Sequence, residues 1–250
     1  MPPIAVQLYS LRVEMDADAV GTLTKVAEMG YKGVEPAGFA DMTPVEFRKV
    51  VEDLGMTICS SHGPGVTLAN FNEAVDTLKS LGVDSSSHMG FGGGTSLEEL
   101  KAEANNINAV CDKLAEVGMT LFMHNHNGEF ATKFDGRTLF DVVFELCPRL
   151  QSEMDVYWTA VGGTDAVAAV RQYAGRLPLM HVKDGLIDPA SPMMALGTGK
   201  LDIAGCLGAA DPAVLKWAIV ELDEVAGDMT EAIADSCRFL TSTGLAEGTK

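Results

Sequence analysis

The segment Thr120-Leu-Phe-Met-His-Asn-His-Asn-Gly-Glu-Phe130 is a short apolar run that ends in two histidines, two asparagines, a glycine and a glutamate. A short apolar run predicts a buried strand, and ligand-type side chains at the end of a strand are typical of a metal or acid–base site. A single segment of this kind is equally consistent with a polar surface loop. Its interpretation therefore depends on whether other segments of the chain end in the same way.

The same organisation, a strand followed by a helix, recurs along the whole chain. Strands are predicted at residues 4–9, 33–36, 56–62, 83–89, 120–126, 150–158, 177–184 and 216–223. Helices are predicted at residues 19–29, 44–54, 70–81, 97–117, 139–146, 165–173, 203–207 and 229–240. Alternating strands and helices imply parallel strands, because each crossover needs a helix to return the chain. Eight such units without a linker predict an α/β fold, a single (β/α)8 TIM barrel over residues 1–250.

The fourth unit fits this scheme least well. Its predicted strand, residues 83–89, holds three serines where a buried parallel strand is normally apolar. The glycine run Gly92–Gly94 that follows is consistent with a rim loop or with a simple connector.

Composition limits the classes of partner. The 250 residues are 47% hydrophobic and 21% charged, as in a globular protein with a sizeable core, and the net charge is −17. This charge repels phosphate backbones and anionic lipid surfaces, so we expect neither nucleic acid nor membrane as a partner. Five dispersed cysteines without a CxxC spacing, no signal-like start and no long apolar span predict a cytoplasmic protein.

Chemistry-bearing residues gather where the predicted strands end. All the histidines do so: His62, His88, His124, His126 and His181. They are joined by the carboxylates Glu35, Glu129, Asp155, Glu221 and Asp223. The carboxyl ends of barrel strands converge on one face, so these side chains are expected to meet there. Imidazole and carboxylate without thiolate predict a divalent ion such as Mn²⁺, Co²⁺, Mg²⁺ or Zn²⁺, and argue against a structural zinc site.

Eight short motifs resemble those of a known family. They are Val6-Gln-Leu-Tyr-Ser10, Gly30-Tyr-Lys-Gly-Val-Glu35, Ser60-Ser-His62, His124-Asn-His126 with Glu129-Phe130, Met154-Asp-Val-Tyr-Trp158, His181-Val-Lys-Asp184, Gly197-Thr-Gly199 and Val220-Glu221. Over essentially its whole length the chain resembles the xylose-isomerase-like TIM barrels, the sugar phosphate isomerase/epimerase superfamily. It is most similar to the branch with inosose dehydratase-like and 3-keto-sugar-processing proteins. These motifs are specific for the superfamily and nearly uninformative about the substrate.

The resemblance implies a divalent metal ion held by one residue from each of the last four strands. By position, three of these ligands are Asp155, His181 and Glu221. In many relatives the remaining ligand, on the fifth strand, is a glutamate that also moves a proton, but here that position is His124. Either His124 is the ligand, or Glu129 folds back to supply a carboxylate. We favour His124 as the ligand, with Glu129 or Glu221 moving the proton.

The other predicted site residues follow from strand ends and from alternation along a strand. His126 and Lys183 have the same parity as His124 and His181, so both should point into the barrel mouth. There they are candidates for catalysis, although Lys183 is equally consistent with a rim lysine. The residues predicted to bind the substrate are Glu35, His62, His88 and Trp158. Gly197-Thr-Gly199 is interpreted as a loop turn, because no P-loop sequence follows.

These features predict an isomerase or epimerase of a small sugar, keto-sugar or polyol that acts through an enediolate. The alternatives are a dehydratase or lyase that shares the same proton abstraction, and a sugar-binding barrel without turnover. Phosphodiester hydrolysis, which also occurs on this fold, is disfavoured by the net charge of −17. The sequence does not select a homodimer over a monomer.

Overall fold

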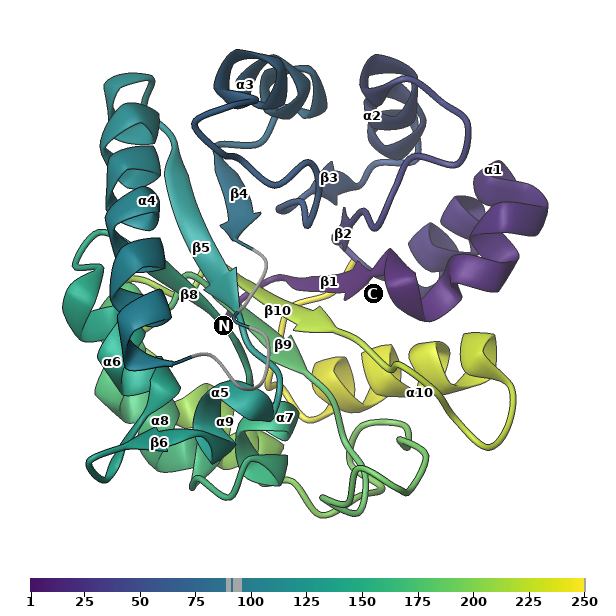
Figure 1. Cartoon of the computed structure of the whole chain (residues 1–250). Coiled ribbons are helices and arrows are strands. Elements are labelled where there is room, and N and C mark those ends of the chain that lie inside the picture. The colour runs from purple at the N-terminus through teal and green to yellow at the C-terminus, as the bar shows by residue number, and fades with distance from the viewer. Residues whose placement is uncertain (89–90, 92–95, 250) are drawn as a thin grey trace.

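Eight parallel strands form one curled sheet at the centre of the molecule (Figure 1). The structure, a computed structural model, describes residues 1–88, 91 and 96–249, so the glycine run Gly92–Gly94 lies outside the described residues. The strands are β1 (Ile4–Gln7), β2 (Gly33–Glu35), β3 (Thr57–Ile58), β4 (Ser85–His88), β5 (Thr120–His124), β8 (Gln151–Asp155), β9 (Leu179–Val182) and β10 (Trp217–Val220). Their hydrogen-bonded order, β3-β2-β1-β10-β9-β8-β5-β4, follows the chain order of a (β/α)8 barrel, and the predicted TIM barrel is confirmed.

Helices surround the sheet (Figure 1). They are α1 (Arg12–Met29), α2 (Pro44–Asp53), α3 (Phe71–Leu81), α4 (Leu97–Glu116), α6 (Leu139–Leu146), α8 (Ala166–Tyr173), α9 (Ile203–Ala209) and α10 (Met229–Ser242). Shorter elements are η1 (Leu8–Leu11), α5 (Gly128–Ala131), α7 (Val156–Val161), η2 (Ala174–Arg176) and the hairpin of β6 (Lys133–Phe134) and β7 (Arg137–Thr138). Among the described residues, no helix is long and apolar enough to cross a bilayer.

Several predicted boundaries were wrong, among them those of the third strand, the first helix and the sixth strand. The first helix begins at Arg12 rather than at residue 19, and it is interrupted at Asp18, whose backbone leaves the helical region. The sixth predicted strand, residues 150–158, ends at Asp155. The Asp155 carboxylate accepts a hydrogen bond from the Trp158 amide at 2.8 Å and caps α7, so the chain turns into a helix there.

The serine-rich β4 is a strand, as predicted. It lies at one end of the hydrogen-bonded strand order, and β3 lies at the other end. The buried Ser86 hydroxyl donates to the Pro64 carbonyl at 3.1 Å, which links β4 to the segment that follows β3. A side-chain hydroxyl therefore connects the two ends of the sheet, a role that an apolar side chain could not fill.

An apolar plug fills the interior of the barrel. Ala5, Phe122, Leu179 and Ile219 are buried and form this cluster, while a larger core lies between the strands and the helices. Successive inward side chains lie two residues apart along a strand. The next inward positions are therefore Gln7, His124, His181 and Glu221, and this alternation places a polar layer directly above the plug.

Candidate active site

A cavity of about 300 Å³ opens above this polar layer. It is lined by Tyr9, Ala37, His62, Ser87, His124, His126, Glu221 and Asp223. Most of these residues follow the carboxyl ends of strands, where barrel enzymes place their active sites. Four of the lining residues, Tyr9, Ala37, Ser87 and Asp223, were not among the predicted site residues, although Asp223 was noted at the end of the eighth strand.

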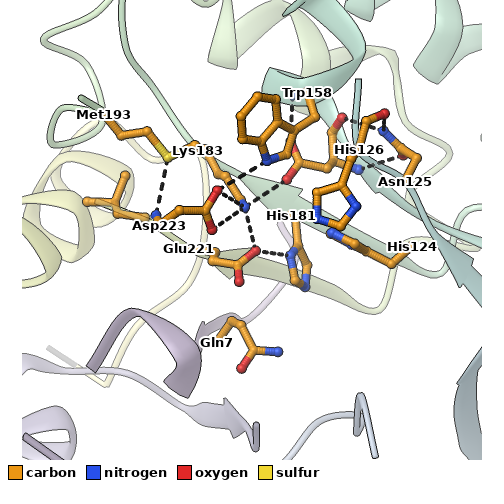
Figure 2. Close-up of polar contacts among 12 residues, drawn as sticks. Gln7, His124, Asn125, His126, Trp158, His181, Lys183, Met193, Glu221 and Asp223 are labelled. Carbon is orange, nitrogen blue, oxygen red and sulfur yellow. Dashed lines mark hydrogen bonds and ion pairs between the residues drawn. The ribbon is translucent and has the colours of Figure 1, made fainter. Parts of the chain in front are cut away.

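The four residues predicted to hold a metal lie together at the base of this cavity. His124, Asp155, His181 and Glu221 are all buried, and each offers a ligand atom within 4.8 Å of the others. His181 Nδ1 lies 2.8 Å from Glu221 Oε2 (Figure 2). Glu129, the alternative fifth-strand ligand, is outside this group. We call these four residues the upper group.

Two atoms of the upper group are buried without a hydrogen bond of good geometry: His124 Nδ1 and Asp155 Oδ2. The Lys183 ammonium lies 3.2 Å from Asp155 Oδ2. Burial raises the pKa of Asp155, and although Lys183 and His181 oppose this, the result is about 6. Leaving such polar atoms unsatisfied in the interior is costly. Nitrogen and carboxylate donors of this kind fit a divalent cation.

Lys183 supplies positive charge to the same carboxylates. Its buried Nζ lies 2.7 Å from Glu221 Oε2 and 2.9 Å from Asp223 Oδ1 (Figure 2). Burial alone would lower the pKa of Lys183, but Glu221, Asp155 and Asp223 raise it above its ordinary value. Burial raises the pKa of Glu221, but Lys183 and His181 lower it by more. The resulting pKa is well below the ordinary value of a glutamate. Lys183 is therefore a charged member of the site and not a rim lysine.

A second set of ionisable side chains lies against His62, and its central member, Glu153, was missed by sequence reasoning. Glu153 Oε2 is 2.5 Å from His62 Nε2 and 3.5 Å from His124 Nδ1. The signal for Glu153 was its position two residues before Asp155, which gives both side chains the same inward direction. Glu153 is fully buried, so it belongs to the interior and not to the sheet surface.

Burial and charge act in opposite directions on these groups. Burial lowers the pKa of His62, but Glu35 and Glu153 raise it to about 9. Burial lowers the pKa of His124 to about 3, helped by the neighbouring His181. Burial raises the pKa of Glu35, and the negative charge of Glu153 adds to this effect.

Glu35 is beneath the cavity and contacts other side chains of the site. It accepts hydrogen bonds from Gln7 Nε2 at 2.8 Å and from the Ser60 hydroxyl, and it lies 2.7 Å from His181 Nε2. A carboxylate in this position fixes the orientation of the imidazole ring. Glu35 thus orients His181 instead of lining the cavity, where the sequence had predicted a substrate contact.

The His124-Asn-His126 segment is held in place by its asparagine. Asn125 Oδ1 accepts from the Asp155 amide at 3.0 Å, and Asn125 Nδ2 donates to the Asp155 carbonyl at 3.2 Å. Glu129 Oε2 accepts from the His126 amide at 2.9 Å. These contacts direct His126 to the cavity and leave Glu129 as a support of the loop, outside the cavity lining.

Two predicted substrate-binding residues lie elsewhere. His88 pairs in register with Met123, whose side chain packs in the outer core, so His88 also points outward. It lines a separate cavity with Glu103 and Asn106, and its predicted place in the mouth is wrong. The half-buried Trp158 is also outside the cavity lining, and its Nε1 donates to Asp223 Oδ2 at 3.2 Å (Figure 2).

The loop with Gly197-Thr-Gly199 is organised around Asp184. The buried Asp184 carboxylate accepts hydrogen bonds from the amides of Gly185, Gly197, Gly199 and Leu201 at 2.8–3.1 Å. The amides of both glycines in the motif are therefore already bonded to a carboxylate. This agrees with the interpretation of the motif as a loop turn.

Comparison with known proteins agrees with this architecture. The sequence profile of the family "Xylose isomerase-like TIM barrel" matches residues 23–243. The chain belongs to this family. No curated protein sequence shows significant similarity to it.

Several solved protein structures share this fold. A sugar phosphate isomerase/epimerase from Parabacteroides distasonis superposes with a TM-score of 0.82 at 22% identity, covering 98% of this chain and 96% of that one. An L-ribulose 3-epimerase superposes with a TM-score of 0.70 at 16% identity, covering 98% of this chain and 95% of that one. A probable 3-DHS dehydratase from Bacillus anthracis superposes with a TM-score of 0.70 at 14% identity, covering 96% of this chain and 98% of that one.

Proposed function

We propose that this protein is a divalent-metal-dependent isomerase or epimerase of a small unphosphorylated keto-sugar or polyol. The observation that carries the proposal is the upper group of buried ligands at the base of a cavity lined by His126 and Glu221. The family membership and the sugar epimerases among similar folds support it.

His124, Asp155, His181 and Glu221 would hold the ion. When bound, a divalent ion polarises a carbonyl oxygen and makes the neighbouring carbon–hydrogen bond more acidic. The side chains of this protein bind, orient and move the proton. Lys183 keeps Asp155 and Glu221 ionised, and its ammonium partly balances negative charge that develops on the substrate.

His126 is the best placed group to accept the proton. Burial lowers the pKa of His126, and the positive charge of Lys183 lowers it further, so the imidazole is neutral at pH 7. Glu221 also faces the cavity and offers a carboxylate from another strand. Two groups from different strands suit an epimerase, in which one removes a proton and another returns it. Glu129 acts through His126 by holding its backbone.

The substrate is proposed to be uncharged. Within the part of the chain that the structure describes, the residues that line the cavity include no lysine or arginine to pair with a phosphate. The Gly197 and Gly199 amides, the alternative phosphate contact, are bonded to Asp184. Tyr9, 45% exposed at the rim, offers an aromatic face that can pack against a sugar ring.

The proposal is tested by incubating the Mn²⁺-loaded protein with a panel of keto-sugars in D₂O. Deuterium next to the carbonyl with all other atoms retained supports an isomerase or epimerase. Loss of water or an alcohol instead supports the runner-up, a dehydratase or lyase, because both begin with the same proton abstraction. His126→Gln should slow exchange by about 100-fold or more, as expected for loss of a general base.

His88→Gln is the matched control, because His88 lines a different cavity and should leave the rate unchanged. Absence of exchange with every keto-sugar, or a His126→Gln variant that exchanges at the wild-type rate, would refute the assignment.

A further inference from the structure

A group of two imidazoles and a carboxylate overlaps the upper group at His124, and the proposed function gives no role to its other two members. Its members are His62, His124 and Glu153, which together with His181 form a second set of metal-ligand type side chains in close proximity. We call His62, His124 and Glu153 the lower group. His62 and His124 line the cavity, so an ion entering the mouth can reach them.

The two nitrogens of His181 show where the upper group ends. Nδ1 faces Glu221 of the upper group at 2.8 Å, while Nε2 faces Glu35 at 2.7 Å. A metal-binding histidine commonly donates its second N–H to a carboxylate, and Glu35 fills that place here. Asp155, His181 and Glu221 alone therefore suffice for the ion that was assigned above to all four residues of the upper group, with His181 oriented from behind by Glu35.

His124 is then available to the lower group. Its Nδ1 is buried, makes no hydrogen bond of good geometry and lies 3.5 Å from Glu153 Oε2. The other carboxylate oxygen, Glu153 Oε1, is also buried without a hydrogen bond of good geometry, and its ion-pair contact is His181 Nε2 at 3.5 Å. Two unsatisfied atoms at neighbouring positions cost free energy in a site without a ligand. A cation held by His124 Nδ1 and the Glu153 carboxylate would give both groups a partner.

The distances suit such a cation. Zinc ligands lie about 2.0–2.2 Å from the metal, so the ligand atoms of a tetrahedral site lie roughly 3.4 Å apart. The His124 Nδ1 to Glu153 Oε2 distance is already 3.5 Å. His62 Nε2 is closer, at 2.5 Å from Glu153 Oε2, so binding of an ion requires this 21% exposed side chain to shift away from Glu153.

Charge balance favours a second ion as well. The carboxylates of Asp155, Glu221 and Asp223 lie beside the Lys183 ammonium, whereas those of Glu35 and Glu153, beneath the cavity, face His181 and His62. One divalent ion in the upper group would leave the carboxylates in excess. A second ion in the lower group, beside Glu153, would compensate most of the remaining negative charge.

We propose that His62, His124 and Glu153 form a second divalent-cation site, distinct from the Asp155–His181–Glu221 site, so that the barrel mouth holds two ions. Two imidazoles and one carboxylate with an open position form a ligand set used by catalytic zinc. This second ion would lie in the same cavity as the site of the proposed function. The inference rests on the proposed function only in taking that cavity as the active site. Its test measures binding and not turnover.

The test counts bound Zn²⁺ per chain, by elemental analysis after chelation, dialysis against Zn²⁺ and removal of unbound ion. The wild-type chain is expected to bind two equivalents. Glu153→Gln and His62→Gln should each bind one, Asp155→Asn should bind one, and the double variant Glu153→Gln/Asp155→Asn should bind none. His88→Gln, a histidine outside the mouth, should keep two.

Glu153→Gln preserves the shape of the side chain, and His62→Gln alters a partly exposed residue, so failure of one variant to fold leaves the other. A wild-type chain that saturates at one equivalent, or Glu153→Gln and His62→Gln variants that both keep two, would overturn the second site. If the single equivalent is lost in Asp155→Asn but kept in Glu153→Gln, the second site fails while the upper group and the proposed function stand.

Discussion

Replacing Lys183 with methionine removes the ammonium from a buried set of carboxylates and keeps most of the side-chain volume. The Lys183 Nζ lies 2.7 Å from Glu221 Oε2, 2.9 Å from Asp223 Oδ1 and 3.2 Å from Asp155 Oδ2, and the side chain is 1% exposed. Removing one partner of a buried ion pair costs about 3–5 kcal/mol of unfolding free energy, because the other charge stays buried. For a chain of this size the loss corresponds to a fall in Tm of roughly 6–20 °C.

The assay is urea unfolding of both proteins in the presence of a chelator, followed by circular dichroism. The sign of the pH dependence follows from Glu221, whose pKa in the folded protein is well below its ordinary value because Lys183 and His181 outweigh the effect of burial. A lowered pKa contributes stability above the unfolded pKa of about 4.3, and the contribution is lost as pH falls through the folded pKa. The difference between wild type and Lys183→Met should therefore be largest at neutral pH and shrink in acid.

Mn²⁺ should restore part of the loss, because a cation in the upper group replaces the missing charge. Saturation at 100 times Kd would return about 2.7 kcal/mol. Lys49→Met is the control, since Lys49 is 71% exposed and its pair with Asp53 is a surface pair worth about 0–1 kcal/mol. Equal urea midpoints for Lys183→Met and wild type at pH 7 would refute the argument that Lys183 balances buried carboxylates.

Two further predictions concern the loop and the proton acceptor. Asp184→Ala removes the acceptor of four backbone amides between Gly185 and Leu201, so the unfolding free energy should fall by about 2–5 kcal/mol. Limited proteolysis should then cut within residues 185–201. Cleavage no faster than in the control variant Asp53→Ala, at an exposed site, would contradict this prediction. Because the pKa of His126 is lowered by burial and by Lys183, the acidic limb of kcat/KM should lie below the ordinary histidine pKa of about 6.5. A limb above that value, measured from pH 4 to 8 with the metal site saturated, would argue against His126 as the base.

Patterns that repeat along the chain predicted the fold. Alternating strand-like and helical segments marked the eight units, and the order β3-β2-β1-β10-β9-β8-β5-β4 confirms the barrel. Boundaries failed where a single side chain redirects the backbone. Residues 156–158 look like part of a strand in sequence, yet the Asp155 carboxylate caps α7 and ends β8 at Asp155. Such capping depends on the direction of a side chain, which hydrophobic periodicity does not report.

The site residues could be predicted wherever the alternation of side chains along a strand was used. Residues were misplaced or missed where this alternation was not considered. His124, Asp155, His181 and Glu221 lie together because each is an inward position at the end of a strand. His88 has the opposite parity, in register with Met123, and points away from the mouth. Glu153 has the same parity as Asp155, but it lies one inward position deeper than the strand end and escaped notice. Tyr9 follows β1 in a 3₁₀ turn, where alternation along a strand no longer applies.

The central claim is that a divalent ion in the upper group enables proton abstraction next to a carbonyl. The measurement that tests it most directly is the rate of deuterium incorporation from D₂O into a keto-sugar before chelation, after chelation and after Mn²⁺ is returned. Wild type should lose exchange on chelation and regain it with Mn²⁺, and Asp155→Asn, which keeps a side chain able to cap α7, should remain inactive throughout. Exchange that is unaffected by chelation, or that persists in Asp155→Asn, would contradict the account.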